Sequence, residues 1–226
     1  MSEQLPLFRP RADLNFDNFF IAANNDTVIH ALREWLSEAD GGIFYLHGAI
    51  GSGRSHLLQA ACRERNAFYL PLHELRDHEA AHVLDGLEAA ELICLDDIET
   101  VLSSTPWCEQ IFYLFNRIVS RRHKLLVSAT QAAANIICEL PDLRSRLSLG
   151  GSFRIYALDD ESIGPALKMR ARERGIELTD DVISFLLARY ARNFDALLLL
   201  LNELDRHSLA EQKRITIPFA RRFLEN

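Results

Sequence analysis

A run of glycines and small polar residues follows the first apolar segment and has the spacing of a phosphate-binding loop. It reads Gly48-Ala49-Ile50-Gly51-Ser52-Gly53-Arg54-Ser55 and leads into a helix-like stretch. Glycines let backbone N–H groups turn toward phosphate oxygens, and the start of the helix adds a partial positive charge. The loop therefore predicts nucleotide binding by Gly48, Gly51, Ser52, Gly53, Arg54 and Ser55, with Ser55 as a magnesium ligand. An ordinary glycine-rich strand-to-helix turn is the alternative.

Arg54 stands where this pattern expects lysine. Arginine keeps the positive charge but replaces a compact ammonium with a wide planar fork, which holds phosphate oxygens from a different point. We therefore expect nucleotide binding to persist and fast hydrolysis to be lost.

Two carboxylates end a later apolar run, where Leu92-Ile93-Cys94-Leu95 is followed by Asp96 and Asp97. In a protein with a phosphate-binding loop, an acidic pair at a strand end completes the nucleotide site. Asp96 is expected to reach the magnesium ion, and Asp97 to orient an attacking water.

Two other groups of residues favour structural explanations. His78 and His82 have the spacing of one helix face, with His73 nearby, but no third ligand has a suitable spacing, so a solvated polar helix is favoured over a metal site. The four cysteines form no Cys-x-x-Cys pair and are interpreted as reduced core residues rather than zinc ligands: Cys62, Cys94, Cys108 and Cys138.

The elements that position these residues alternate between short strands and helix-like stretches. The strands are expected at 43–46, 68–70, 92–95, 125–127 and 153–156. Nearly continuous apolar runs are typical of parallel strands covered on both faces, so we predict an α/β domain with a parallel five-stranded sheet. From about Leu158 the strand signals stop and amphipathic helical stretches follow, so a small all-helical domain is expected at 158–226.

Composition excludes several classes of protein. The net charge of −7 argues against non-specific DNA binding by the chain as a whole, because a phosphate backbone is also negative. The longest aliphatic run, at 196–201, is far shorter than the roughly 20 residues that cross a bilayer, and no signal segment opens the chain. We expect a cytoplasmic protein that binds no membrane.

Taken together, these segments resemble the DnaA-type AAA+ family from Phe16 to the end of the chain. The segment from Phe16 to Asn25 resembles the one that contributes Phe19 and Asn25 to the adenine pocket in that family. Ser128 or Thr130 matches the polar sensor I residue at the end of the fourth strand. The segment 140–147 resembles box VII, where Arg146 matches the arginine finger. The resemblance implies an AAA+ domain at 16–157 and a helical lid at 158–226.

A short segment before this module resembles a sliding-clamp-binding pentapeptide. Residues 1–15 are expected to be flexible, with clamp contacts from Gln4, Leu5, Leu7 and Phe8. DnaA continues into a DNA-reading domain, whereas this sequence stops at Asn226. The combination resembles the Hda-type regulators, which couple the DNA-loaded clamp of DNA polymerase III, its beta subunit, to the inactivation of DnaA.

One departure from the family concerns the lid, where Asp195 aligns with the sensor II arginine. A carboxylate cannot hold a γ-phosphate, so together with Arg54 it suggests that ADP or ATP serves as a structural ligand with little turnover. Which of the two nucleotides is the working ligand, and whether the chain self-associates, stay open.

The function implied by the resemblance is negative regulation of replication initiation. Tethered to the clamp and thereby associated with the nucleoid, the protein would stimulate hydrolysis of DnaA-bound ATP through Arg146. Two alternatives share the fold: a self-sufficient phosphate-loop ATPase or small kinase, favoured by Asp96 and Asp97, and a DNA-binding initiator paralogue.

Overall fold

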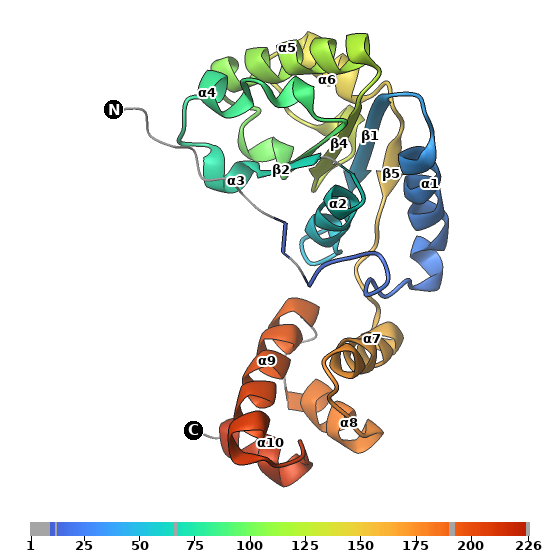
Figure 1. Cartoon of the computed structure of the whole chain (residues 1–226), viewed down its shortest axis with the longest axis vertical. Helices are drawn as coiled ribbons and strands as arrows, with labels where there is room; N and C mark the ends of the chain where they lie inside the picture. Colours follow the sequence, from blue (N-terminus) through green and yellow to red (C-terminus); the bar gives the residue numbers. More distant parts are fainter. Residues whose placement is uncertain (1–9, 12, 66, 190–192, 225–226) are drawn as a thin grey trace. The chain divides into compact units, whose positions relative to one another are not determined.

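The fold is described from a computed structural model that covers residues 10–11, 13–65, 67–189 and 193–224. The chain divides into two compact units, Met1–Ala157 and Leu158–Asn226. The predicted clamp-binding residues Gln4, Leu5, Leu7 and Phe8 lie outside the described residues. Figure 1 labels the elements along the chain.

The first unit is built on a parallel five-stranded sheet with strand order β2-β3-β4-β1-β5. Its strands are β1 (Gly42–His47), β2 (Ala67–Pro71), β3 (Leu92–Asp96), β4 (Lys124–Ala129) and β5 (Ser152–Arg154). Every residue of β3 and β4 is buried. This confirms the prediction of a parallel sheet from continuous apolar runs, because strands covered on both faces have no polar side.

Alternating residues of each strand pack against two helical layers. Phe44, Leu46 and Leu126 lie in one cluster with α1 (Asp26–Ser37) and α2 (Arg54–Arg63). Tyr45 and Val127 belong to a cluster on the opposite face, with helices that include α5 (Thr105–Arg121) and α6 (Pro141–Leu147). The sheet is thus the middle layer of three, as Figure 1 shows for this unit.

Short elements complete the first unit. Two are helices on the α5 side of the sheet, and the others are single 3-10 turns: α3 (Leu72–Leu75), α4 (Ala80–Leu84), η1 (Ala23–Asn25), η2 (Leu87–Ala89), η3 (Ile98–Thr100) and η4 (Ala133–Asn135). The prediction that His78 and His82 share one helix face is wrong, since His78 lies between α3 and α4. The chain turns between the two helices, and His82 pairs with Glu79 at 3.2 Å.

The cysteines pack inside this unit. Cys62, Cys94 and Cys108 are buried and Cys138 is partly buried, and all four are free thiols. Burial raises the pKa of the Cys108 thiol to about 12, and the neighbouring Cys138 adds to that rise. The predicted core position is thus confirmed for the three buried cysteines.

The second unit consists of helices packed around one apolar cluster. They are α7 (Asp160–Glu173), α8 (Asp180–Arg189), α9 (Phe194–Glu211) and α10 (Ile217–Leu224). Polar residues begin two of them: Asp159 accepts a hydrogen bond from the Ser162 N–H, and Asn193 accepts from the Asp195 N–H. The predicted helical domain is confirmed. Within the described ranges, no helix is long and apolar enough to cross a membrane.

Candidate functional site

Three glycines shape the loop between β1 and α2, and each has a measurable reason to lack a side chain. Gly51 and Gly53 have φ of +78° and +91°, the left-handed region that favours glycine. A Cβ atom on Gly53 would lie 2.6 Å from the Phe19 ring, and one on Gly48 would lie 2.3 Å from the Ile155 carbonyl oxygen. The backbone of the loop is therefore free to approach a ligand closely.

The loop also holds polar groups that have no hydrogen-bond partner among the described residues. The Ser52 hydroxyl is buried and unpartnered, in a residue that is 5% exposed. A buried unsatisfied hydroxyl costs free energy, and a phosphate oxygen is an acceptor that would satisfy it. Helix α2 begins at Arg54 without a side-chain cap, so the partial positive charge of its N-terminus would also stabilise a bound anion. These features fit a bound phosphate group.

Asp96 occupies the carboxyl end of β3 and is held by two hydroxyl groups. The Tyr69 hydroxyl donates to Asp96 Oδ2 at 2.7 Å, and the Ser128 hydroxyl donates to Oδ1. Burial raises the pKa of Tyr69 well above its ordinary value, and the adjacent Asp96 carboxylate raises it further. Asp96 is only 1% exposed. This carboxylate is therefore fixed in orientation by the neighbouring strands β2 and β4.

The predicted magnesium ligands Ser55 and Asp96 offer oxygen atoms, which suit that ion. Ser55 is the second residue of α2 and is partly exposed. Each Asp96 oxygen already accepts one hydrogen bond from its own chain, and a carboxylate oxygen has room for one more. The magnesium role of the two residues stays a prediction.

Ser128 and Thr130, the two sensor candidates, connect the ends of β3 and β4. The Ser128 hydroxyl donates to Asp96 and accepts from the Asp97 N–H at 2.9 Å. The Thr130 N–H donates to Glu99 Oε1 at 2.8 Å. Ser128 is fully buried, whereas Thr130 is partly exposed. The structure thus brings Ser128 to the aspartate pair, as expected of a polar residue at the end of the fourth strand.

Arg54 turns toward the acidic end of β3. Its guanidinium Nη1 lies 3.0 Å from Asp97 Oδ1 and 4.0 Å from Glu99 Oε1. Burial and the adjacent Asp96 raise the pKa of Asp97, and Arg54 acts in the opposite direction. His73 Nδ1 lies 3.8 Å from Asp97 Oδ2. The loop arginine and the second aspartate therefore form an ion pair inside the predicted nucleotide site.

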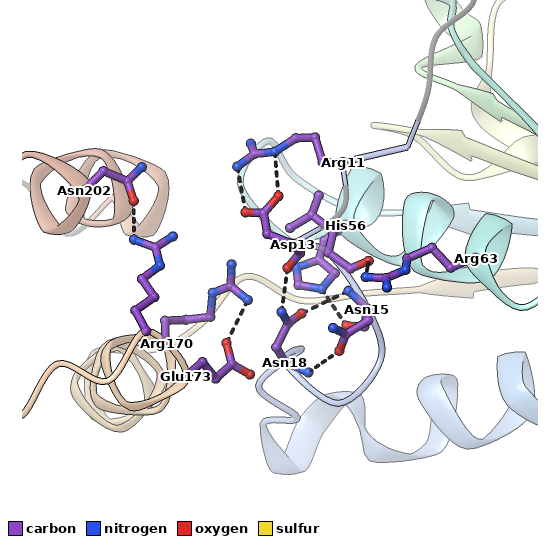
Figure 2. A network of polar contacts seen from close by, with 11 residues as sticks. Arg11, Asp13, Asn15, Asn18, His56, Arg63, Arg170, Glu173 and Asn202 are labelled. Atoms are coloured by element: carbon purple, nitrogen blue, oxygen red, sulfur yellow. Dashed lines mark hydrogen bonds and ion pairs between the residues drawn. The ribbon is translucent and has the colours of Figure 1, made fainter. Parts of the chain in front are cut away.

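Residues 15–19, which precede α1, are held against α2 by a hydrogen bond and a ring contact to His56 (Figure 2). The side chains of Asn15 and Asn18 each accept a hydrogen bond from the other residue's backbone N–H, at 2.9 and 3.0 Å. The His56 ring is hydrogen-bonded to the Asn15 carbonyl at 2.8 Å and lies edge-on to Phe19, with ring centroids 5.2 Å apart. These contacts place Phe19 against the phosphate-binding loop, where the resemblance expects an adenine-pocket residue.

Asn25 is buried beside the end of the first unit. Its side-chain amide donates to the Tyr156 carbonyl at 2.8 Å and accepts from the Tyr156 N–H at 2.8 Å. With only 1% of its surface exposed, the residue uses its amide to fix the chain just after β5. Any contribution of Asn25 to an adenine pocket therefore comes through the position of Tyr156.

Arg146 lies at the opposite edge of the sheet from the phosphate-binding loop. It lines a cavity of about 340 Å³ together with Gly41, Gly42 and Ile43, which lie at the amino end of β1. Its guanidinium carbon is 5.5 Å from the Phe115 ring centroid and 5.8 Å from that of Phe112. Within the described part of the chain it pairs with no carboxylate, which leaves its positive charge uncompensated.

Sequence reasoning missed two residues of the nucleotide edge. Tyr69 was treated only as part of an apolar strand, and His73 only as one of three histidines. A tyrosine within a buried strand needs a partner for its hydroxyl, and that requirement was the available signal. Nothing in the spacing of His73 indicates its approach to Asp97, because η3 and α3 meet only in the fold.

The second unit buries one of its basic residues. A spacing of two turns the side chains of Lys168, Arg170, Arg172 and Arg174 around the helix and so predicts a solvated helix. Arg170 is nevertheless buried at 4% exposure, and its guanidinium pairs with Glu173 at 3.1 Å (Figure 2). The spacing of two does scatter these side chains, but one of the scattered positions falls on the buried face, between Leu167 and Ala171. Asp195, the predicted sensor II position, is exposed in the first turn of α9.

Comparisons with known proteins address the whole chain. Residues 11–154 match the family model of the bacterial DnaA ATPase domain, and residues 159–224 match that of the Hda lid domain. An uncharacterized protein of Haemophilus influenzae is 38% identical over 231 residues, with 99% of each chain covered.

Solved structures share the fold at low identity. Domain III of the Thermotoga maritima initiation protein DnaA has a TM-score of 0.78 at 18% identity, covering 93% of this chain and 95% of that one. AMPPCP-bound DnaA from Aquifex aeolicus has a TM-score of 0.71 at 20% identity, covering 87% and 66%. The chain therefore belongs to the DnaA-type AAA+ family and carries the lid domain of that family's Hda branch.

Proposed function

We propose that this protein regulates the initiation of chromosomal replication by promoting hydrolysis of ATP bound to a DnaA protein. The observation that carries the proposal is the separation between Arg146 and the phosphate-binding loop of the same chain. Arg146 shares a cavity with the amino end of β1, whereas the loop follows the carboxyl end of that strand. An arginine in this position is suited to a nucleotide held by a neighbouring molecule.

The length of β1 gives the scale of this separation. The strand has six residues, and at about 3.3 Å per residue it spans on the order of 20 Å. One arginine side chain does not extend over that distance. The location of Arg146 therefore argues for action in trans.

The chemistry of an arginine finger matches what Arg146 offers. A planar positive fork neutralises the charge that develops on the γ-phosphoryl group, and such residues are generally worth about 10³ to 10⁵ in rate. The faces of Phe112 and Phe115 hold the guanidinium at the surface without neutralising it. The charge thus stays available for an anion on a partner.

The protein's own nucleotide, ADP or ATP, has a structural role in this proposal. Glycines of the loop, the Ser52 hydroxyl and Arg54 would hold its phosphates, and Phe19 lies where the base would be contacted. Two solved DnaA structures of the same fold contain AMPPCP, which supports nucleotide binding at this loop. Magnesium, where bound, would use Ser55 and Asp96.

The remaining part of the proposal is attachment to the sliding clamp. Gln4, Leu5, Leu7 and Phe8 have the pattern of a segment whose apolar anchors enter a pocket on the partner. Tethering would concentrate the protein near DNA-loaded clamps, and so near newly replicated DNA, without strong DNA binding of its own.

The test is a DnaA ATP-hydrolysis assay with and without clamp loaded on DNA. We expect release of phosphate from DnaA-bound ATP to require both this protein and the loaded clamp. Stimulation that ignores the clamp would remove the tethering part, and no stimulation under any condition would overturn the proposed function.

A self-sufficient ATPase is the second candidate, because Asp96 and Asp97 lie beside the phosphate-binding loop. The ion pair between Arg54 and Asp97 opposes it, since a carboxylate paired with arginine is less able to orient a water molecule. Turnover of many ATP molecules per second by the purified protein alone would favour this candidate.

A further inference from the structure

The ion pair between the buried Arg54 and the partly exposed Asp97 is close but poorly aligned. Nη1 and Oδ1 are 3.0 Å apart, and Arg54 is 7% exposed. Both atoms are nevertheless without a hydrogen bond of acceptable geometry. Strong guanidinium–carboxylate pairs make two aligned hydrogen bonds, so this pair gains charge attraction without that geometry. Such a contact can be exchanged for a better acceptor.

A phosphate group in the loop is such an acceptor. Arg54 directly follows Gly53 and is the first residue of α2, so its guanidinium belongs to the same structure that would surround the phosphate. Phosphate oxygens accept the planar fork of arginine in a bidentate manner. Phosphate and Asp97 therefore compete for one cation.

Charge repulsion acts in the same direction as this competition. Asp97 is ionised when it pairs with Arg54, and a phosphate drawn to Arg54 approaches that carboxylate. Like charges at short range in a partly buried site raise the free energy of the bound state. Both effects lower nucleotide affinity.

We propose that Asp97 restrains nucleotide binding by holding Arg54 in the site. In this proposal, which rests on the proposed nucleotide site, Asp97 is a positioning residue for Arg54. The family pattern connects the Asp97 carboxylate with hydrolysis. In this protein it sets the affinity of the site for a nucleoside diphosphate or triphosphate. Glu99 contributes less, because its Oε1 is 4.0 Å from Nη1 and already accepts the Thr130 N–H.

Asp97 can be changed without disturbing its own backbone. Its φ of +54° is left-handed, a region that asparagine also tolerates. The Asp97 N–H donates to Ser128 Oγ at 2.9 Å, and its carbonyl accepts from the Thr100 hydroxyl at 2.7 Å. Neither contact uses the carboxylate. Asp97→Asn therefore removes the charge and keeps the turn.

The experiment is isothermal titration of the full chain with ADP in magnesium buffer. Asp97→Asn is expected to bind ADP at least fivefold more tightly than the wild type. Asp77→Asn, a change at a carboxylate that is 90% exposed, is the matched control and should leave the affinity unchanged. In an Arg54→Ala background, the gain from Asp97→Asn should be smaller than in the wild type, because the competition for the guanidinium is gone and only the charge repulsion remains.

A second readout separates this proposal from a purely structural role of Asp97. Asp97→Asn should lower the melting temperature without nucleotide, since an ion pair is lost, and should increase the rise that ADP produces. Adenosine, which lacks phosphate, should bind wild type and Asp97→Asn equally.

The outcomes distinguish the two proposals. Unchanged or weaker ADP binding by Asp97→Asn, with clear binding by the wild type, would overturn the inference and leave the nucleotide site intact. Absence of binding by both proteins would overturn the nucleotide site and the inference together. Binding by Asp97→Asn alone would support the inference.

Discussion

Two arginines at opposite edges of the same sheet have contrasting surroundings. Arg54, at the carboxyl edge, is 7% exposed and lies 3.0 Å from a carboxylate of its own chain. Arg146, at the amino edge, is partly exposed and lies over two aromatic rings. An arginine paired within its own chain has its charge already compensated, whereas one on aromatic faces keeps its charge for a partner.

Under the proposed function, this contrast would let one chain combine a nucleotide site of low turnover with a strong effect on another protein. At the carboxyl edge, Tyr69 and Ser128 satisfy Asp96 with hydrogen bonds, whereas Arg54 and Asp97 are paired by charge without an aligned hydrogen bond. The amino edge offers an uncompensated cation beside an open cavity. The first arrangement suits retention of a ligand, and the second suits contact with a partner.

The largest effect is expected from a substitution at the amino edge of the sheet. Arg146→Ala should reduce stimulation of DnaA-bound ATP hydrolysis by two or more orders of magnitude, because the finger charge is removed. Arg146→Lys should rescue it poorly, since a point charge does not reproduce the planar fork. Phosphate release in single-turnover assays measures both.

Arg144→Ala is the matched control for this prediction. Arg144 lies on the same short helix but is exposed. Its removal should leave stimulation unchanged, and both alanine variants should keep the wild-type affinity for nucleotide and for the clamp. Full stimulation by Arg146→Ala would show that the amino edge does not act as described.

The next effect concerns the predicted clamp-binding segment. Replacing Leu7 and Phe8 together with alanine should weaken clamp binding about a hundredfold, because two apolar anchors of this kind dominate the binding energy. Surface plasmon resonance on immobilised clamp measures the affinity. Unchanged affinity would contradict the tether, and a lowered melting temperature would show that the segment packs against its own fold.

The stabilisation that ADP produces should depend on Arg54 at the carboxyl edge and not on Arg146 at the amino edge. An ADP concentration one hundred times the Kd should stabilise the wild-type protein by about 2.7 kcal/mol. Arg146→Ala should show the same gain, because the carboxyl edge is untouched, whereas Arg54→Ala should lose most of it. Thermal or urea unfolding with and without ADP gives these values. Equal gains for all three proteins would indicate that Arg54 does not contact the phosphates.

A smaller effect is expected at Asn25, behind the site. Asn25→Ala removes both hydrogen bonds to the Tyr156 backbone, so the free energy of unfolding should fall by about 2 kcal/mol. Urea unfolding measures this change, with Asn24→Ala, an exposed neighbour, as the control. Loss of stability in Asn24→Ala alone would contradict the role assigned to Asn25.

The motifs that form the candidate nucleotide site could be predicted from the sequence, but the hydrogen bonds and ion pairs between their side chains could not. A glycine loop after an apolar strand, and two aspartates after another, gave the nucleotide edge because parallel strands end at a common edge. The approach of Tyr69 to Asp96 depends on the register of β2 against β3, which pairs Tyr69 with Cys94. Register between distant segments leaves no trace in spacing, so this pairing was missed.

Arg54 and Arg170 illustrate the same limit for charged residues. Arg54 was predicted to hold phosphate, but its partner Asp97 is far away in sequence and comes close only because β3 and β1 lie in one sheet. The spacing of the basic residues in α7 predicts a solvated helix, and the burial of Arg170 runs against the usual preference of arginine for the surface. Composition and periodicity predict which face of a helix or strand is buried better than they predict which charged side chains form ion pairs.

The most direct test of the account follows two nucleotides in one assembly. DnaA carrying γ-labelled ATP is mixed with loaded clamp and with this protein holding unlabelled ADP. In a second reaction, DnaA carries unlabelled ATP and this protein holds γ-labelled ATP. We predict release of labelled phosphate when the label is on DnaA, dependent on Arg146, and little release when labelled ATP is on this protein. Release from this protein's own ATP, with the DnaA-bound label retained, would contradict it.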